Sequence, residues 1–324
     1  MPKSVYFRAE ELLPAAWRGL ACQGPLRSFN PALLADGPGW LFAYRMVGAD
    51  SRRRIAVGRL DAELRIIPGS AVALSDLIRF AAERPYPDAV RRWFADPRLY
   101  RLDGRLFVYW NSGWNPQPNF QFIAELDSDT LMPRGAAREL RLAGARRPIE
   151  KNWTFFGDDP VYALYSPMQQ AILDVSLDST PAVELRPRHA RPWDIGCFAW
   201  RYGELRGGAP PQRVGESYYA FCHTVYPTPL GYNYTAVVYR FSAAFPFRPT
   251  DAPLRALRLE NPLGPDTLGD RLNPHAGTVI YPCGAAHRDG TWLISYGIND
   301  ARAAIALLSA AEVEAAMQPL TATA

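Results

Sequence analysis

The sequence predicts an all-β protein, specifically a five-bladed β-propeller with short helical insertions, and three observations predict it. Thirty prolines and 24 glycines interrupt the 324 residues. Between them, apolar and polar residues alternate in short runs, which is typical of strands bounded by turns. The third observation is a repeat. A short strand, a turn with Asp or Gly, a strand rich in aromatic residues and a further strand recur five times along the chain.

The five units begin near residues 30, 96, 152, 208 and 282, so successive openings are 66, 56, 56 and 74 residues apart. They contain FNPALLADGPGWLFAYR, ADPRLYRLDGRLFVYWNS, EKNWTFFGDDPVYALYSP, RGGAPPQRVGESYYAFCHTV and IYPCGAAHRDGTWLISYGINDA. Five small sheets placed radially around a channel protect their strand edges by repetition. A β-sandwich of about 15 irregular strands is the alternative architecture. No linker divides the repeats, so we expect residues 1–324 to form a single domain.

Two amphipathic stretches are expected to be helical. Residues 75–83, SDLIRFAAE, follow the pattern of a helix that begins at a Ser75 cap. Residues 309–317, SAAEVEAAM, form the second stretch, near the end of the chain. Both are short enough to be insertions between strands.

Composition excludes several classes of protein. Apolar residues make up 48% of the chain, which excludes a disordered chain, and a net charge of +4 is too small to indicate a nucleic-acid binder. No window approaches the ~18 apolar residues of a membrane span, and the first residues lack a signal-peptide pattern, so we expect a cytoplasmic protein. No metal site is expected either, because the cysteines lie far apart without a paired motif: Cys22, Cys197, Cys222 and Cys283.

The openings of the five units are expected to meet at the propeller axis, because the innermost strand of each blade lines it. These opening residues are Asn30, Asp96, Asn152, Arg206 with Gly207 and Gly208, and the Pro282-Cys283-Gly284 turn. The turns after the second strands add Arg45, Asn111, Ser112, Tyr165, His223 and Asn299-Asp300. The sequence therefore predicts a polar, arginine-rich funnel flanked by aromatic residues, with Trp93, Trp110, Trp114 and Trp153 as candidates for contact with a sugar.

The acidic residues of this funnel restrict the chemistry. Glycoside hydrolysis usually needs two carboxyl groups, whereas the inner openings offer only Asp96. The other acids lie beside openings or in turns and are weaker candidates: Glu150, Asp159, Asp194 and Asp300. In phosphorolysis the nucleophile is phosphate, so a second carboxylate is unnecessary and cations are needed instead. The available set is Arg45, Arg98, Lys151, Arg206 and His223.

Each arginine could instead belong to a surface or inter-blade ion pair. Lys151 stands out, because the chain has only one other lysine, Lys3. The same cations would also hold a nucleotide diphosphate or a sugar phosphate, which leaves a glycosyltransferase open.

Several motifs resemble those of glycoside hydrolase family 130, the β-mannoside phosphorylases and their relatives. The similar segments are FNPALL followed by AYR, then ADPRLY, EKNW, and GGAPP followed by FCHTV, and they span most of the chain. The resemblance implies a five-bladed propeller and an inverting mechanism with one aspartate as general acid and phosphate as nucleophile. It implies that Asp96 is the acid, that Asn30 and Arg45 contact substrate, and that Lys151 and His223 match a family lysine and histidine.

Three positions depart from the family pattern. Ala95 replaces a glutamate, Tyr165-Ser166 stands where phosphorylases tend to carry His-Arg before a proline, and Arg206 replaces a lysine-containing segment. Missing an arginine at that place weakens the case for phosphate. Related propellers include mannosyltransferases that use a sugar nucleotide.

These observations predict a carbohydrate-active enzyme that cleaves or forms a β-mannoside-type bond with inversion, with phosphate as nucleophile. A glycosyltransferase and a non-catalytic glycan-binding propeller are the alternatives. We expect no cofactor, inorganic phosphate as co-substrate, and a small oligosaccharide or sugar phosphate as the bound partner; the oligomeric state stays open. The predicted site consists of Asp96 as catalytic acid; Asn30, Arg45, Arg98, Asn152 and Asp300 for substrate; and Lys151, Arg206 and His223 for phosphate.

Overall fold

β-strands make up most of the regular structure of the chain. The computed structural model describes residues 3–81, 85–114, 116–195, 197–229, 231–264 and 272–320. Helices in these ranges are short, and the longest, the 3-10 helix η1, has 8 residues (Ala15–Cys22). None of the helices described here is long and apolar enough to cross a membrane. The predicted all-β class is therefore confirmed.

Within the described residues the strands form five consecutive antiparallel groups, which we number one to five. Group one consists of β2 (Arg27–Asp36), β3 (Gly39–Val47) and β4 (Arg53–Leu60). Group two consists of β5 (Ala95–Leu102), β6 (Arg105–Asn111), β7 (Gln121–Leu126) and β8 (Arg138–Leu142). Group three consists of β9 (Thr154–Gly157), β10 (Val161–Ser166), β11 (Ala171–Ser176) and β12 (Val183–His189). Group four consists of β13 (Glu204–Arg206), β14 (Gln212–Val214), β15 (Ser217–Thr228), β16 (Gly231–Ser242) and β17 (Pro249–Pro253). Group five consists of β18 (Ala276–Arg288), β19 (Thr291–Ile298) and β20 (Arg302–Ser309).

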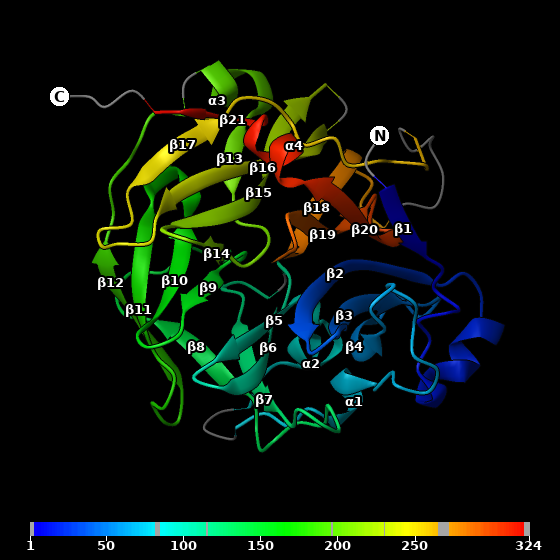
Figure 1. Ribbon diagram of the computed structural model, residues 1–324. Helices are drawn as coiled ribbons and strands as arrows, with labels where there is room; N and C mark the ends of the chain where they lie inside the picture. Colours follow the sequence, from blue (N-terminus) through cyan, green and yellow to red (C-terminus); the bar gives the residue numbers. More distant parts are fainter. Residues whose placement is uncertain are drawn as a thin grey trace.

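These groups coincide with the five sequence units and follow one another around a common centre (Figure 1). Short parallel pairings join β8 to β12, β16 to β18, and β20 to β2. The two ends of the chain add outer strands. β1 (Lys3–Phe7) pairs with β20, and β21 (Met317–Pro319) pairs with β17.

The hydrophobic core is divided among the contacts between neighbouring groups. Five large clusters of buried side chains each combine residues of two adjacent groups. Going around the molecule, the clusters contain Ile55 with Trp110, Tyr109 with Leu173, Phe156 with Val237, Phe221 with Ile294, and Ile305 with Phe42. Group five thus packs back onto group one. Because the apolar area is buried between groups, the inner ends of the strands can carry polar residues.

The helix predicted over residues 75–83 is wrong beyond its first turn. Helix α1 spans only Leu74–Leu77, and Ile78 has an extended backbone. Phe80 then bridges Ala137 as a strand would, and its ring packs against Phe122 at 4.9 Å. Tertiary contacts of an extended segment therefore bury the apolar residues that suggested a helix; residues 82–84 lie outside the described part.

The second predicted helix forms, in a shorter version. Helix α4 spans Ala310–Glu314 and begins with a capping box in which Ser309 and Glu312 satisfy each other's backbone N–H groups. It ends before Met317, where β21 begins. The remaining helices are α2 (Asp88–Arg92), α3 (Cys197–Tyr202) and the 3-10 helix η2 (Pro167–Gln169).

Candidate functional site

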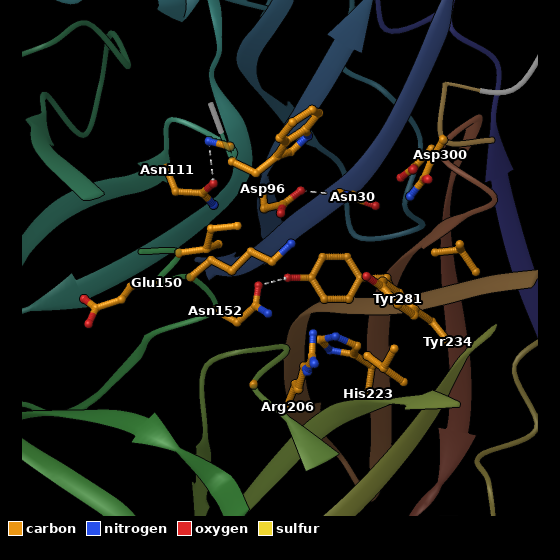
Figure 2. A pocket seen from close by; sticks show the side chains of 18 of the residues that line it. Asn30, Asp96, Asn111, Glu150, Asn152, Arg206, His223, Tyr234, Tyr281 and Asp300 are labelled. Carbon is orange, nitrogen blue, oxygen red and sulfur yellow. Dashed lines mark hydrogen bonds between the residues drawn. The ribbon is translucent and has the colours of Figure 1, made fainter. Parts of the chain in front are cut away.

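A polar cavity of about 980 Å³ opens where the inner strands of the five groups meet. All five groups contribute side chains to it (Figure 2). Eight of the nine predicted site residues line this cavity: Asn30, Arg45, Asp96, Lys151, Asn152, Arg206, His223 and Asp300. The ninth, Arg98, does not. The repeat thus predicted correctly that the first four openings converge, at Asn30, Asp96, Asn152 and Arg206 with Gly207. The prediction is wrong for Gly208, Ser112, Asn299 and the Pro282-Cys283-Gly284 turn, which do not line the cavity; Tyr281 lines it in place of that turn.

The backbone explains why Asn and Asp occupy the first three openings. Asn30, Asp96 and Asn152 have φ values of 50°, 52° and 65°, in the left-handed region that Asn and Asp tolerate better than most residues. Asn30 and Asp96 also lie at irregularities in the strand pairing, and such bulges redirect side chains. Two glycines, Gly297 and Gly207, allow close approach here, because a Cβ at either would overlap Asn30 or Asn152.

Asp96 lies among positive charges. Its Oδ1 accepts a hydrogen bond from Nδ2 of Asn30 at 2.7 Å and is 3.5 Å from Nη1 of Arg45 (Figure 2). Burial raises the pKa of Asp96, but the charges of Arg45, Arg98 and Lys151 outweigh it, and the net pKa lies below the usual value. In the free cavity Asp96 is therefore a carboxylate.

Asp300 is a second carboxyl group with the opposite behaviour. It lies in the turn between β19 and β20 and lines the same cavity. Burial raises its pKa, the negative charge of Asp96 adds to this, and the cations Arg45 and Lys151 reduce the effect without cancelling it. Two carboxyl groups in one cavity with pKa values displaced in opposite directions can hold different protonation states.

The other candidate acids are unsuited to be a free base. Glu150 lines the cavity, but its Oε1 accepts hydrogen bonds from the backbone N–H of Arg147 at 2.9 Å and the hydroxyl of Tyr165 at 3.1 Å. Asp159 and Asp194 are exposed and lie outside the cavity lining.

The cations of the cavity differ in how far they are neutralised. Arg206 donates to Glu204 at 3.0 Å. Lys151, in contrast, makes no hydrogen bond or ion pair within the described residues, although it is only partly exposed. Burial lowers its pKa, and Arg206 and Arg45 add to this, while Asp96 opposes it. Among the residues described, Lys151 is thus a positive charge in the cavity without a direct partner.

His223 is a neutral member of the site. Burial and the charges of Lys151 and Arg206 lower its pKa to about 3. Its Nδ1 is buried without a hydrogen-bond partner among the described residues, and its ring packs against Tyr281 at 4.7 Å. The prediction that His223 adds to a cationic cluster is therefore corrected: the imidazole can offer one N–H donor but no charge at neutral pH.

Arg98 lies beneath the cavity instead of lining it. It is 1% exposed, and its guanidinium donates to the carbonyls of Gly208 at 2.7 Å and Pro97 at 2.9 Å and to the hydroxyl of Tyr281 at 2.7 Å. The Tyr281 hydroxyl in turn donates to Oδ1 of Asn152 at 2.7 Å (Figure 2). Arg98 therefore connects its own group two with groups four and five directly, and with group three through Tyr281. The predicted direct contact of Arg98 with substrate is wrong, because its side chain is buried outside the cavity lining.

Replacing Arg98 by methionine is expected to lower the free energy of unfolding by about 3–5 kcal/mol, because buried carbonyls and a tyrosine hydroxyl lose a charged partner. Urea denaturation measures this, with the slope against urea unchanged. Arg213→Met, at an exposed arginine, is the matched control and should change stability by less than about 0.5 kcal/mol. Equal losses in both variants would contradict a structural role for Arg98.

Several residues that line the cavity were not predicted from the sequence. Tyr281 directly precedes the predicted Pro282 opening, so the repeat pointed within one residue of it. Tyr234 lies within a long strand, where an aromatic residue is equally typical of core. Of the four candidate tryptophans, Trp110 is in the core, whereas Trp93, Trp114 and the largely buried Trp153 line the cavity.

The fold has clear counterparts among solved structures. No protein-family model and no curated protein matches the sequence. The β-1,2-mannobiose phosphorylase of Listeria innocua, solved with β-1,2-mannobiose, has a TM-score of 0.59 at 14% identity, over 96% of this chain and 98% of that one. A mannose phosphorylase of Leishmania mexicana, solved with phosphate ion, gives 0.55 at 11% identity, over 98% and 92% of the two chains.

A third structure comes from glycoside hydrolase family 130, described as a family of mannoside phosphorylases that contains hydrolases targeting β-1,2 mannosidic linkages in Candida mannan. It has a TM-score of 0.61 at 13% identity, over 94% of both chains. Identities this low establish the fold and leave the reaction open. The chain thus shares the fold of the family 130 mannoside phosphorylases and hydrolases, which confirms at that level the resemblance of its motifs.

Proposed function

We propose that this protein is a carbohydrate-active enzyme that cleaves or forms a β-mannoside-type glycosidic bond with inversion, using inorganic phosphate as nucleophile. The five groups of strands are then the blades of one five-bladed propeller, and the central cavity is the active site. One observation carries the proposal: Asp96 occupies the same polar cavity as Lys151, which has no direct partner in the part of the chain that the structure describes. The phosphorylases of similar fold, one with mannobiose and one with phosphate, support the choice of substrates.

Asp96 acts as general acid in this mechanism. It gives its proton to the glycosidic oxygen while a phosphate oxygen attacks the anomeric carbon from the other side of the sugar ring. The bond between that carbon and the leaving oxygen breaks, which yields a sugar 1-phosphate and a free sugar. Lys151, Arg206 and Arg45 balance the charge of phosphate, whereas Asn30, Asn152 and Asp300 bind sugar hydroxyls.

A general acid must carry a proton, but Asp96 is deprotonated in the free cavity because its pKa is lowered. Two of the three cations that lower its pKa, Arg45 and Lys151, are among those that would bind phosphate. An anion bound to Lys151 and Arg45 cancels part of their charge, so the pKa of Asp96 rises when the anion arrives. The acid is thereby prepared only when the nucleophile is present.

Anion binding is therefore expected to take up protons. Sulfate is a suitable probe, because it is a dianion that does not titrate between about pH 4 and 7. Since the pKa of Asp96 is higher in the bound state, less than one proton per site is taken up at pH values between its free and bound pKa. Calorimetric titration in buffers of different ionisation enthalpy measures this uptake.

Two variants identify the residue that takes up the proton. Asp96→Asn should abolish the uptake, and Asp300→Asn should leave most of it. If Asp300→Asn abolishes it instead, the proton belongs to Asp300. Sulfate that binds without any proton uptake would contradict the coupling.

Product analysis with β-1,2-mannobiose, with and without inorganic phosphate, tests the proposed function. Formation of a sugar 1-phosphate only in the presence of phosphate is the expected result. Free mannose in both conditions would indicate a hydrolase and would direct attention to Asp300 as base. Absence of turnover in both would contradict the proposal, and a binding screen with nucleotide sugars would then test the transferase.

A further inference from the structure

Two tryptophans stand beside Asp96 at the wall of the cavity. Strand β5 begins at Ala95, which pairs with Asn111 at the end of β6. Trp93 and Trp114 therefore lie just beyond the end of this ladder, on the two segments that flank the acid, and both line the cavity. The wall that carries Asp96 is thus continued by aromatic side chains.

The pair has a specific arrangement. The two rings lie edge to face, with centroids 6.1 Å apart and an interplanar angle of 77°. Gly113, at φ 75°, makes this possible, because a Cβ there would overlap the Trp93 indole. The guanidinium of Arg53 stacks on Trp93 at 4.4 Å. Trp93 is therefore held on two sides, whereas Trp114 remains 57% exposed.

This arrangement suits a pyranose ring. One face of a sugar ring can present C–H groups to an aromatic surface, while hydroxyls around its edge take hydrogen bonds. Trp114 offers the aromatic surface, and Arg53, which lines the same cavity, carries guanidinium N–H donors beside it. Burial of apolar area on such a ring contributes binding free energy.

We propose that Trp114, supported by Trp93 and Arg53, binds the second sugar ring, on the leaving-group side of the scissile bond. The inference rests on the proposed function, because it uses Asp96 as the acid. Asp96 must reach the oxygen that joins the two rings, so the second ring lies directly beyond Asp96, where Trp93 and Trp114 continue the wall. Trp114 then determines the preference for disaccharides over monosaccharides.

Calorimetric titrations of Asp96→Asn protein, in which turnover is suppressed, test this proposal with mannose as a one-ring probe and β-1,2-mannobiose as a two-ring probe. Adding Trp114→Ala should weaken mannobiose binding about tenfold and mannose binding less than about twofold. Trp114→Phe should restore most of the loss. Phe245→Ala, at an equally exposed aromatic residue (54%) outside the cavity, is the control and should change neither affinity.

The outcomes separate the two proposals. Unchanged mannobiose affinity in Trp114→Ala, or an equal loss for both sugars, would overturn the subsite while leaving the β-mannoside function in place. If the Asp96→Asn parent binds neither sugar, both the proposed function and the subsite are contradicted.

Discussion

Replacing Asp96 by asparagine is expected to lower turnover of a β-mannoside roughly 10²- to 10⁴-fold, the usual contribution of general acid catalysis. The protein should still fold, because asparagine is isosteric and tolerates the left-handed backbone at φ 52°. Its amide oxygen can also accept the hydrogen bond from Asn30. The measurement is kcat at saturating disaccharide and phosphate, together with the thermal unfolding midpoint.

Two further carboxyl variants make this result specific. Asp194→Asn, at an exposed carboxyl group outside the cavity, should retain full turnover. Asp300→Asn should raise KM for the sugar more than it lowers kcat, since Asp300 is proposed to bind hydroxyls. If Asp300→Asn instead loses turnover while Asp96→Asn keeps it, Asp300, whose pKa is raised, is the acid.

The convergence of the site was predictable because it depends on local features that repeat. Asn30, Asp96 and Asn152 each stand at the opening of a unit, and the order of the units fixes their order around the centre. The same repeat placed Arg45 and His223, which pair across from Phe29 and Arg206 on the first inner strands of their groups. The repeat pattern therefore sufficed to predict that these five residues lie at the cavity.

The direction in which a side chain points and its charge state were less predictable, because both depend on contacts with distant parts of the chain. Arg98 follows Asp96 by two residues, but the irregular pairing between Ala95 and Arg98 turns its side chain toward Gly208 and Tyr281. The neutral state of His223 follows from burial under Tyr234 and Tyr281, which come from other strands. No spacing within either motif contains that information.

The departure from the family pattern at Tyr165-Ser166 also has a structural counterpart. The Tyr165 hydroxyl donates to Glu150, and Arg147 stacks over its ring at 5.9 Å and lines the cavity. An arginine is thus present at this wall, although it comes from the preceding loop. The cavity therefore retains positive charge where the motif lacks it.

Replacing Lys151 by methionine is expected to raise KM for inorganic phosphate by roughly 10- to 100-fold, the range for loss of a hydrogen bond to a charged group. Lys151 is the strongest candidate because, within the described residues, no carboxylate pairs with it directly, whereas Glu204 already pairs with Arg206. Methionine preserves most of the side-chain volume and removes the charge. Initial rates at varied phosphate, with disaccharide saturating, provide the measurement.

The comparison between the two substrates decides what Lys151 does. If it binds phosphate, KM for the disaccharide should change less than about threefold, and Lys3→Met, at the exposed other lysine, should change nothing. A rise in the disaccharide KM with an unchanged phosphate KM would place Lys151 in the sugar site.

Because Lys151 also lowers the pKa of Asp96, Asp96 in the Lys151→Met variant should stay protonated to higher pH. The descending limb of kcat/KM for the disaccharide, which reports the free enzyme, should therefore move to higher pH.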